Sequence, residues 1–375
     1  MTYSRLIYLS DIDVTIGNGP GINEREFCHT LRTREDNANI LILNRFSPGK
    51  LHNDRRFSNK LLSWLYGEII ACKMLISSNI TKDDLIISRL YVFPLALLLF
   101  IRTRKCGLHL RHCSPGINTY QTSSAFSLRA VLLAMDRRIK QKLVSYAGSI
   151  DVPTIEQKAT WEDRGLEPSK VRVKANCVNC DKFSLANRPP QPPQDNIATV
   201  GYVGGSPTRR GLTVLMEIAR KTGENIRFIV VGDDPDLAAM RQRVAAEFGP
   251  DRFEFTGQVD YDLVPQIMAR LDFGVAFDDQ ERLKLDGNSN QKIRQYLASG
   301  AFAITNKAAE KELEDSGFAL RVDIDEPDAM VAFIKDKSSI PHQELIEIRQ
   351  NMYEYCVNNI SCDKLNNDLI NFIWK

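Results

Sequence analysis

The chain has 375 residues, of which 43% are hydrophobic and 26% charged, with a formal net charge of +2. This length favours two domains over one, and the ordinary apolar content is that of a soluble globular protein, which excludes an intrinsically disordered chain. The charge is unevenly divided: residues 1–185 carry 27 Lys/Arg against 17 Asp/Glu (+10), and residues 186–375 carry 22 against 30 (−8). The two halves are therefore expected to face different partners.

Cysteine usage and hydropathy bear on location. Eight cysteines are scattered along the chain, which favours a reducing compartment over a disulfide framework. The first residues, MTYSRLIYLSD, lack the long apolar region of a signal peptide. The most apolar run, Leu90–Ile101, is about half as long as a bilayer-spanning helix must be. These features predict a cytoplasmic protein.

A basic stretch follows that apolar run. Between Arg102 and Lys142 the sequence contains nine Lys/Arg and one acid, Asp136. Two interpretations are open: a solvated face, or a surface for an anionic substrate or membrane. Leu90–Ile101 is predicted to be a buried core helix, with a membrane-surface segment as the alternative. If the membrane interpretation holds, the protein is peripheral at the inner face of the cell membrane.

In the first half, short apolar runs alternate with segments of helical periodicity. The first helix is predicted to begin with Asn23 and Glu26 as a capping-box pair. The predicted strands are 5–9, 39–43, 85–88, 107–112, 149–154 and 171–174, and the predicted helices are 23–34, 57–77, 93–102, 127–146 and 155–164.

Residues 186–196, ANRPPQPPQDN, are predicted to form a linker, because four prolines in five residues exclude helix. The alternation then restarts, which implies parallel sheets with right-handed crossovers in both halves. The expected fold class is α/β: two Rossmann-like domains, 1–185 and 197–340, facing across a cleft. A helical tail is predicted for 341–375, with packing back onto the first domain left open. The later predicted strands are 198–203, 226–231, 253–256, 273–276 and 301–305, and the helices are 211–222, 237–248, 263–269 and 291–298.

Ligands of open α/β sheets bind beyond the carboxyl ends of the strands. In the first half the loop Gly17–Gly21, which includes Gly19, follows the first strand, and its glycines let a substrate approach the backbone closely. The loop lacks the GxGxxG pattern and no acid ends the second strand, so NAD binding is not expected. His112 ends a strand in the basic half and is either an acid/base or hydrogen-bonding group, or a buried structural histidine.

Two loops of the second half predict phosphate binding. Residues 204–211, GGSPTRRG, follow a strand and open a helix, and Arg209 and Arg210 offer the bidentate geometry that suits phosphate. Residues 286–306, DGNSNQKIRQYLASGAFAITN, form a polar loop, a short helix, a glycine C-cap and a buried strand. Lys292 lies in the first turn of that helix, where a cation is unfavourable unless an anion also binds.

Other patterns carry little weight. Cys177-Val-Asn-Cys180 has metal-ligand spacing, but no second pair follows at zinc-finger distance. Asp-x-Asp pairs at residues 11–13 and 234–236 lie in strand-to-helix loops, where short acidic turns are common. No metal, cofactor or nucleic acid is therefore expected.

The second half resembles the donor-binding domain of family 4 glycosyltransferases, which are retaining enzymes of the GT-B fold. The resemblance rests on VGYVGGSPTRRGLTVLMEIA (200–219), IRFIVVGDDPD (226–236), FEFTGQVDYDLVPQIMARLDFGVAF (253–277) and NQKIRQYLASGAFAITN (290–306). GNGPGINEREF and VRVKANCVNCDKF resemble shorter motifs of the first domain. Three positions depart from the family: Gly287 and Gln295 stand where it has two glutamates, and Tyr202 replaces an arginine.

The resemblance implies transfer of a sugar, with retention, from a nucleotide-diphosphate donor to a glycan or lipid-linked acceptor in cell-surface polysaccharide or glycolipid synthesis. Residues 1–185 would be the acceptor side and 197–340 the donor side. Without a metal, the leaving diphosphate would be stabilised by cations and helix N-termini. An inactive GT-B scaffold and a GT-B sugar-nucleotide epimerase are the alternatives. The implied catalytic residues are His112, Gly19 and Lys292; the implied donor-binding residues are Gly204, Arg209, Arg210, Asp286, Asn288, Ser289, Lys292 and Gln295.

Overall fold

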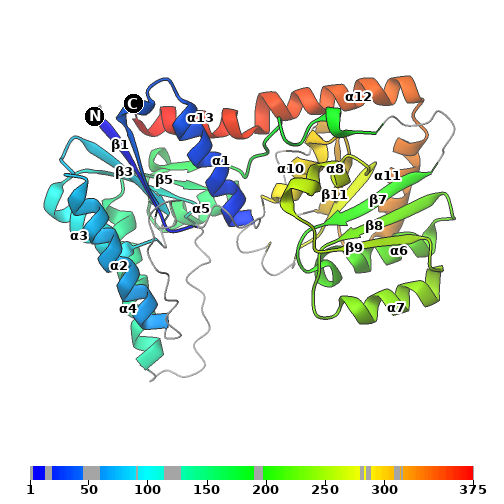
Figure 1. Cartoon of the computed structure of the whole chain (residues 1–375), viewed down its shortest axis with the longest axis horizontal. Coiled ribbons are helices and arrows are strands. Elements are labelled where there is room, and N and C mark those ends of the chain that lie inside the picture. Colours follow the sequence, from blue (N-terminus) through cyan, green and yellow to red (C-terminus); the bar gives the residue numbers. More distant parts are fainter. Residues whose placement is uncertain are drawn as a thin grey trace. The chain divides into compact units, whose positions relative to one another are not determined.

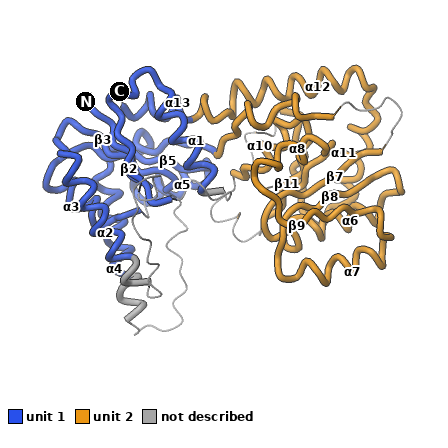
Figure 2. Tube along the Cα trace, in the orientation of Figure 1, with its two compact units in different colours: residues 1–175, 366–375 blue, residues 176–365 orange. Residues whose placement is uncertain are grey.

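The computed structural model describes residues 3–12, 19–44, 60–89, 92–113, 128–189, 197–278, 283, 289–307, 313 and 316–374, with backbone alone at 19–20, 60–63 and 128–133. Two compact units are present, coloured separately in Figure 2: unit 1 comprises residues 1–175 and 366–375, and unit 2 residues 176–365. The division falls before the Pro-rich segment. Residues 186–189 belong to unit 2, where Arg188 donates to the Leu271 carbonyl (2.9 Å) and the Asp272 carboxylate (2.7 Å). Residues 190–196 lie outside the described residues.

Unit 1 is built on a six-stranded parallel sheet of order β2-β1-β3-β4-β5-β6 (Figure 1). Successive side chains of a strand point to opposite faces, so the sheet has two apolar layers. One face packs on α2, α3 and α4, and the other on α1 and α13. The strands are β1 (Arg5–Ser10), β2 (Ile40–Asn44), β3 (Asp84–Arg89), β4 (Gly107–Arg111), β5 (Ser149–Val152) and β6 (Val171–Val173); the helices are α1 (Gly19–Thr33), α2 (Lys60–Ser77), α3 (Pro94–Arg104), α4 (Leu128–Tyr146), α5 (Ile155–Asp163) and the short η1 (Asn37–Asn39) and η3 (Pro168–Lys170).

The predicted strands of unit 1 are confirmed to within two residues, but the start of its first helix is wrong. Helix α1 begins at Gly19, so Asn23 and Glu26 lie inside it and do not form a capping box. The missed signal is Pro20, because proline's fixed φ suits the first turn of a helix. Glu26 is buried within the helix.

Unit 2 has a second six-stranded parallel sheet, of order β12-β11-β10-β7-β8-β9, and a single apolar core. Strand β12 and helix α11 were not predicted. The strands are β7 (Ala198–Val203), β8 (Ile226–Val231), β9 (Phe253–Gly257), β10 (Phe273–Ala276), β11 (Phe302–Asn306) and β12 (Ala319–Val322); the helices are η4 (Leu185–Asn187), the π-helical η5 (Thr208–Leu212), α6 (Thr213–Lys221), α7 (Leu237–Phe248), η6 (Tyr261–Leu263), α8 (Val264–Met268), α10 (Gln291–Ala298), α11 (Pro327–Ser338), α12 (His342–Tyr355) and η8 (Cys356–Ile360).

The chain returns to unit 1 through α13 (Cys362–Trp374), whose Leu369, Ile370 and Ile373 join the core of that unit. Just before the return, Cys362 forms a disulfide with Cys177, so the expectation that the cysteines stay free is wrong for this pair. The other six cysteines are free thiols. Among the helices that the structure describes, none combines the length and apolarity needed to span a bilayer.

Candidate active site

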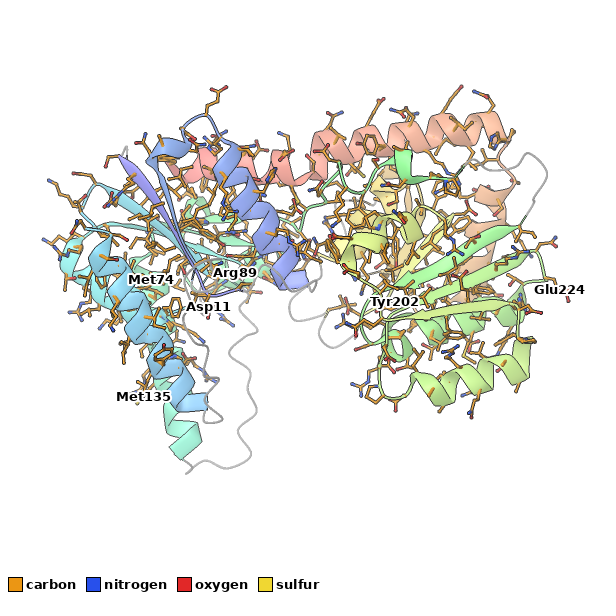
Figure 3. The ribbon with its side chains drawn as sticks, in the orientation of Figure 1. Asp11, Met74, Arg89, Met135, Tyr202 and Glu224 are labelled. Carbon is orange, nitrogen blue, oxygen red and sulfur yellow. A yellow bond between two sulfur atoms is a disulfide. The ribbon has the colours of Figure 1, made fainter. Side chains whose placement is uncertain are left out.

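The candidate site lies where two neighbouring strands of unit 2 end. Strands β7 and β10 pair in parallel although β8 and β9 come between them in the sequence. The chain therefore leaves the two strands in opposite directions, and at such a point α/β proteins bind ligands beyond the carboxyl ends of the strands. Tyr202 and Gly204 lie at the end of β7, and Asp278 follows β10; Figure 3 marks Tyr202.

The loop after β7 is shaped by a glycine with positive φ. Gly204 has φ +145°, a conformation that side chains disfavour. A Cβ atom on Gly204 would lie 2.2 Å from Cε of Lys292, so the absence of a side chain leaves room for the lysine stem. The loop then enters the helical segment formed by η5 and α6.

Asp234 fixes the start of that segment. Its carboxylate accepts hydrogen bonds from the backbone N–H of Thr208 (2.9 Å) and from its hydroxyl (2.7 Å). A carboxylate at a helix start is favourable because it meets unpaired N–H groups and the positive end of the helix dipole. The Asp-x-Asp pattern at 234–236 is therefore explained by local structure, and no cluster of metal-binding side chains occurs among the described residues.

Arg210, but not Arg209, contacts the acid that follows β10. Its Nε lies 3.3 Å from Oδ1 of Asp278, whereas Arg209 is exposed. Asn306 fixes the backbone of Asp278 in turn, because its Oδ1 accepts from the Asp278 N–H (2.7 Å). The guanidinium of Arg210 is thus oriented across the ends of β7 and β10.

Lys292 is half-buried beside Arg210, with Asp278 nearby. Asn290 caps α10 by accepting from the Lys292 backbone N–H (3.1 Å), which fixes the residue in the first turn. The ammonium donates to the Tyr202 hydroxyl (3.3 Å) and lies 4.9 Å from the centre of its ring. Burial, and then the Arg210 cation, lower the pKa of Lys292 to about 8, while Asp278 opposes them. Two cations and a helix N-terminus in one place favour an anionic ligand.

The other donor residues predicted on the α10 side have protein partners. Gln295 is buried and its amide nitrogen donates to the Tyr261 hydroxyl (3.2 Å). The Ser289 hydroxyl accepts from the backbone N–H of Asn176 (2.7 Å). Asp286 and Asn288 lie outside the described residues.

His112 and Gly19 belong to unit 1. His112 follows β4 with φ 50°, and its backbone N–H points at the Asp151 carboxylate (3.3 and 3.4 Å). Burial and the nearby Arg89 cation hold the pKa of His112 well below its usual range, so its imidazole is neutral at pH 7. Its Nε2 is buried and has no hydrogen-bond partner among the described residues. Gly19 opens α1, whereas Gly17 and Asn18 are not described.

The structure therefore brings together Gly204, Arg210 and Lys292 from the sequence-predicted set. Sequence reasoning missed the role of Asp278 and treated Tyr202 only as a departure from a family pattern. Both signals were present, since an acid directly after a buried strand and a tyrosine at the end of another are side chains at the ligand-binding edge of a sheet.

Two six-stranded parallel sheets with flanking helices are the architecture of GT-B glycosyltransferase structures, so the predicted fold is confirmed. Anabaena HepE in complex with UDP aligns with a TM-score of 0.65 over 98% of this chain and 98% of its own, at 14% identity. Sucrose-phosphate synthase from Thermosynechococcus elongatus aligns with a TM-score of 0.67 over 97% of each chain, at 15% identity.

The family model matches part of the second unit. Residues 197–336 match the model of the family described as glycosyl transferases group 1. The 2-deoxystreptamine glucosyltransferase of Streptomyces kanamyceticus is 36% identical over 84 residues. That match spans 21% of this chain and 21% of the enzyme's length. The family match contains Gly204, Arg210, Asp278 and Lys292.

Proposed function

We propose that the protein is a glycosyltransferase that takes a sugar from a nucleotide-diphosphate donor. The observation that carries this proposal is the half-buried Lys292 ammonium beside Arg210, beyond the carboxyl ends of β7 and β10. The match of residues 197–336 to glycosyl transferases group 1 and the structural likeness to a UDP complex support a nucleotide-sugar ligand.

The chemistry follows from the leaving group. When the bond between the anomeric carbon and the diphosphate oxygen breaks, negative charge grows on the diphosphate. Lys292 and Arg210 stabilise that charge together with backbone N–H groups at the start of α10. Ser289 and Gln295 stay assigned to the donor, as do Arg209, Asp286 and Asn288. Gln295 offers amide hydrogen bonds to a ribose and no negative charge.

The finer assignments rest on the resemblance to family 4. They are retention of anomeric configuration, a glycan or lipid-linked acceptor, and a place in cell-surface polysaccharide or glycolipid synthesis. We assign His112 and Gly19 to the sugar side of the reaction. The neutral imidazole of His112 can accept or donate a hydrogen bond to a sugar hydroxyl.

The first experiment measures turnover of a panel of nucleotide-sugars, by release of the nucleoside diphosphate and by NMR of the sugar. A transferase is expected to release UDP or its counterpart slowly by hydrolysis and faster with an acceptor. His112→Ala should lower this rate while leaving the affinity for UDP unchanged. Binding of a nucleoside diphosphate without turnover of any donor, with or without acceptors, would contradict the transferase assignment.

A specific observation favours one alternative, an inactive GT-B scaffold: Gln295 stands where the family has a donor-binding glutamate, and it is already bonded to Tyr261. Such a scaffold would retain the phosphate cluster and bind nucleotide without releasing sugar. The third reading from the sequence, a sugar-nucleotide epimerase, would convert the donor into an isomeric sugar with no acceptor. NMR of the sugar product separates all three.

The affinity for UDP is expected to fall as the pH rises above 8. Burial lowers the pKa of Lys292 to about 8 in the free protein, so above this pH the ammonium has to regain a proton before it binds a diphosphate. The expected loss is up to about tenfold per pH unit. Calorimetry between pH 7 and pH 9.5, in buffers of different ionisation enthalpy, measures both the affinity and the proton uptake.

Lys292→Arg is the control for this pH dependence, because a guanidinium stays charged throughout that range. Its affinity profile should be flat above pH 8. A wild-type profile without proton uptake would show that Lys292 does not meet the diphosphate.

A further inference from the structure

Three adjacent helices of unit 1 expose aliphatic side chains on their outer surfaces. Helix α3 contacts both α2 and α4, and all three cover the same face of the sheet (Figure 1). Leu65, Ile69 and Ile76 recur at helical spacing on α2, and Leu95 and Leu99 do so on α3. We call the set with Met135 of α4, labelled in Figure 3, the α2–α4 face; its members are 40–61% exposed and are Leu65, Ile69, Ile76, Leu95, Leu99 and Met135.

These positions differ from the buried sides of the same helices. Ala96, Leu97 and Phe100 of α3 are at most 6% exposed, whereas Leu95 and Leu99 are 42% and 53% exposed. From the sequence, two interpretations of this apolar run were open, a core helix and a membrane-surface segment. Helix α3 has a buried side that joins the core and an exposed side that is also apolar. Single exposed leucines are ordinary in soluble proteins, but stripes on adjoining helices indicate a surface that is covered by something.

The charges around these stripes are of one sign. Among the side chains that the structure describes on the three helices and on the turn after α3, the exposed cations are Lys73, Arg102, Arg104, Lys105, Arg137, Arg138 and Lys142. The acids on the described part of the helices are both engaged: Glu68 is buried and accepts from the Ala96 N–H (2.8 Å), and Asp136 pairs with Lys140 (2.7 Å). The occupant of this face must therefore be both apolar and negatively charged.

We propose that the α2–α4 face docks on a membrane surface of anionic phospholipids. Leucine and isoleucine side chains enter the boundary between headgroups and acyl chains, while Lys and Arg meet lipid phosphates. A second copy of the chain, placed symmetrically, would set cations against cations, which disfavours that occupant. This inference is independent of the proposed glycosyl transfer, since none of these residues belongs to the candidate active site.

The test is flotation of the full-length protein with vesicles of phosphatidylcholine, with and without phosphatidylserine, at low and high salt. Wild type should float with the anionic vesicles at low salt and sink at high salt. Ile69→Asp with Leu99→Asp removes two exposed aliphatic groups that the membrane would bury, and should weaken partitioning by about 100-fold or more. Arg137→Gln, Arg138→Gln and Lys142→Gln together should weaken it roughly 100-fold, at about tenfold per cation.

Matched controls come from unit 2. Ile346→Asp changes an equally exposed isoleucine on α12, and Arg243→Gln with Lys335→Gln removes exposed cations. These variants should float like wild type, and every variant should unfold at the wild-type temperature, which reports on folding. Failure of wild type to float with anionic vesicles at low salt overturns the proposal, as does flotation of both α2–α4 variants. A wild-type dimer that Ile69→Asp with Leu99→Asp dissociates would assign the face to a second copy instead.

Discussion

Replacing Lys292 with Met is expected to weaken the binding of UDP by about 30-fold or more. The ammonium is half-buried, donates to the Tyr202 hydroxyl, fits beside Gly204 and lies near Arg210. Its loss therefore removes a partly desolvated charge that a diphosphate would otherwise meet. Truncating one partner of such a pair costs roughly 2–5 kcal/mol, which is about 30-fold to several thousand-fold in affinity. Calorimetry at pH 7, below the pKa of the lysine, measures the loss.

A second variant tests the position of Lys292 by changing Gly204, which lies against it. Gly204→Ala places a methyl group 2.2 Å from Lys292 Cε and forces a side chain into φ +145°, so it should displace the ammonium and weaken UDP binding while Lys292 is still present. Gly223→Ala is its matched control, because a Cβ there meets no atom within 4 Å. If Gly204→Ala and Gly223→Ala bind UDP equally well, the loop does not position the lysine.

The two neighbouring arginines provide a comparison within one turn. Arg210 faces Asp278, whereas Arg209 is exposed, so Arg210→Ala should weaken UDP binding more than Arg209→Ala does. Equal losses would mean that the sequence-based assignment of both arginines is correct and that the orientation seen without ligand changes on binding.

Local sequence signals were enough to predict a helix or strand where the hydrophobic pattern agrees with the tertiary environment. Helix α10 has the predicted bounds, 291–298, and Gly300 adopts the positive φ (78°) of a glycine C-cap. Where two sequence signals predicted different helix starts, the structure followed the one that the sequence analysis had not used. At the start of α1 a proline in the first turn outweighed an apparent capping box. The short β12, whose residues are half-buried apart from Val322, has too weak an alternation to be recognised in the sequence.

The candidate site was predictable as a list of residues but not as an arrangement. Lys292 and Arg210 follow from strand-to-helix loops, which the sequence displays. Asp278 contacts Arg210 because β7 pairs with β10. The order of strands in a sheet cannot be predicted from local periodicity. The burial that lowers the pKa of Lys292 depends likewise on Tyr202 and Gly204, which are far away in sequence.

The disulfide is the clearest case of a feature beyond local sequence. Cys177 and Cys362 are separated by 185 residues, and the Cys-x-x-Cys spacing drew attention to Cys180, which is a free thiol. What brings the pair together is backbone pairing: the Val178 N–H donates to the Ile360 carbonyl (3.1 Å) and the Cys362 N–H to the Val178 carbonyl (2.8 Å). The bond thus closes a loop that contains nearly all of unit 2.

Reduction of this bond is expected to lower the melting temperature of unit 2 by about 5–15 °C. Cross-linking a loop of this length restricts the unfolded chain, and removal of a native disulfide typically costs about 2–5 kcal/mol. For a unit of this size each kcal/mol corresponds to roughly 2–4 °C. Calorimetry with and without a dithiol reductant measures the shift, and thiol titration of the denatured chain should find six thiols before reduction and eight after it.

The control removes the bond without changing the other thiols. Cys177→Ser with Cys362→Ser should melt near the reduced wild type and show no further shift with reductant, whereas Cys72→Ser should retain the shift of wild type. Because both cysteines are at most 4% exposed, a thiol reagent reaches them only when the pairing of residues 178 and 361 opens. Two results would show that the disulfide is absent: eight reactive thiols in the unreduced protein, or a wild-type melting temperature that the reductant does not change. If both measurements agree with it, the chain segments beside the unit boundary are covalently joined and unit 2 unfolds as a closed loop.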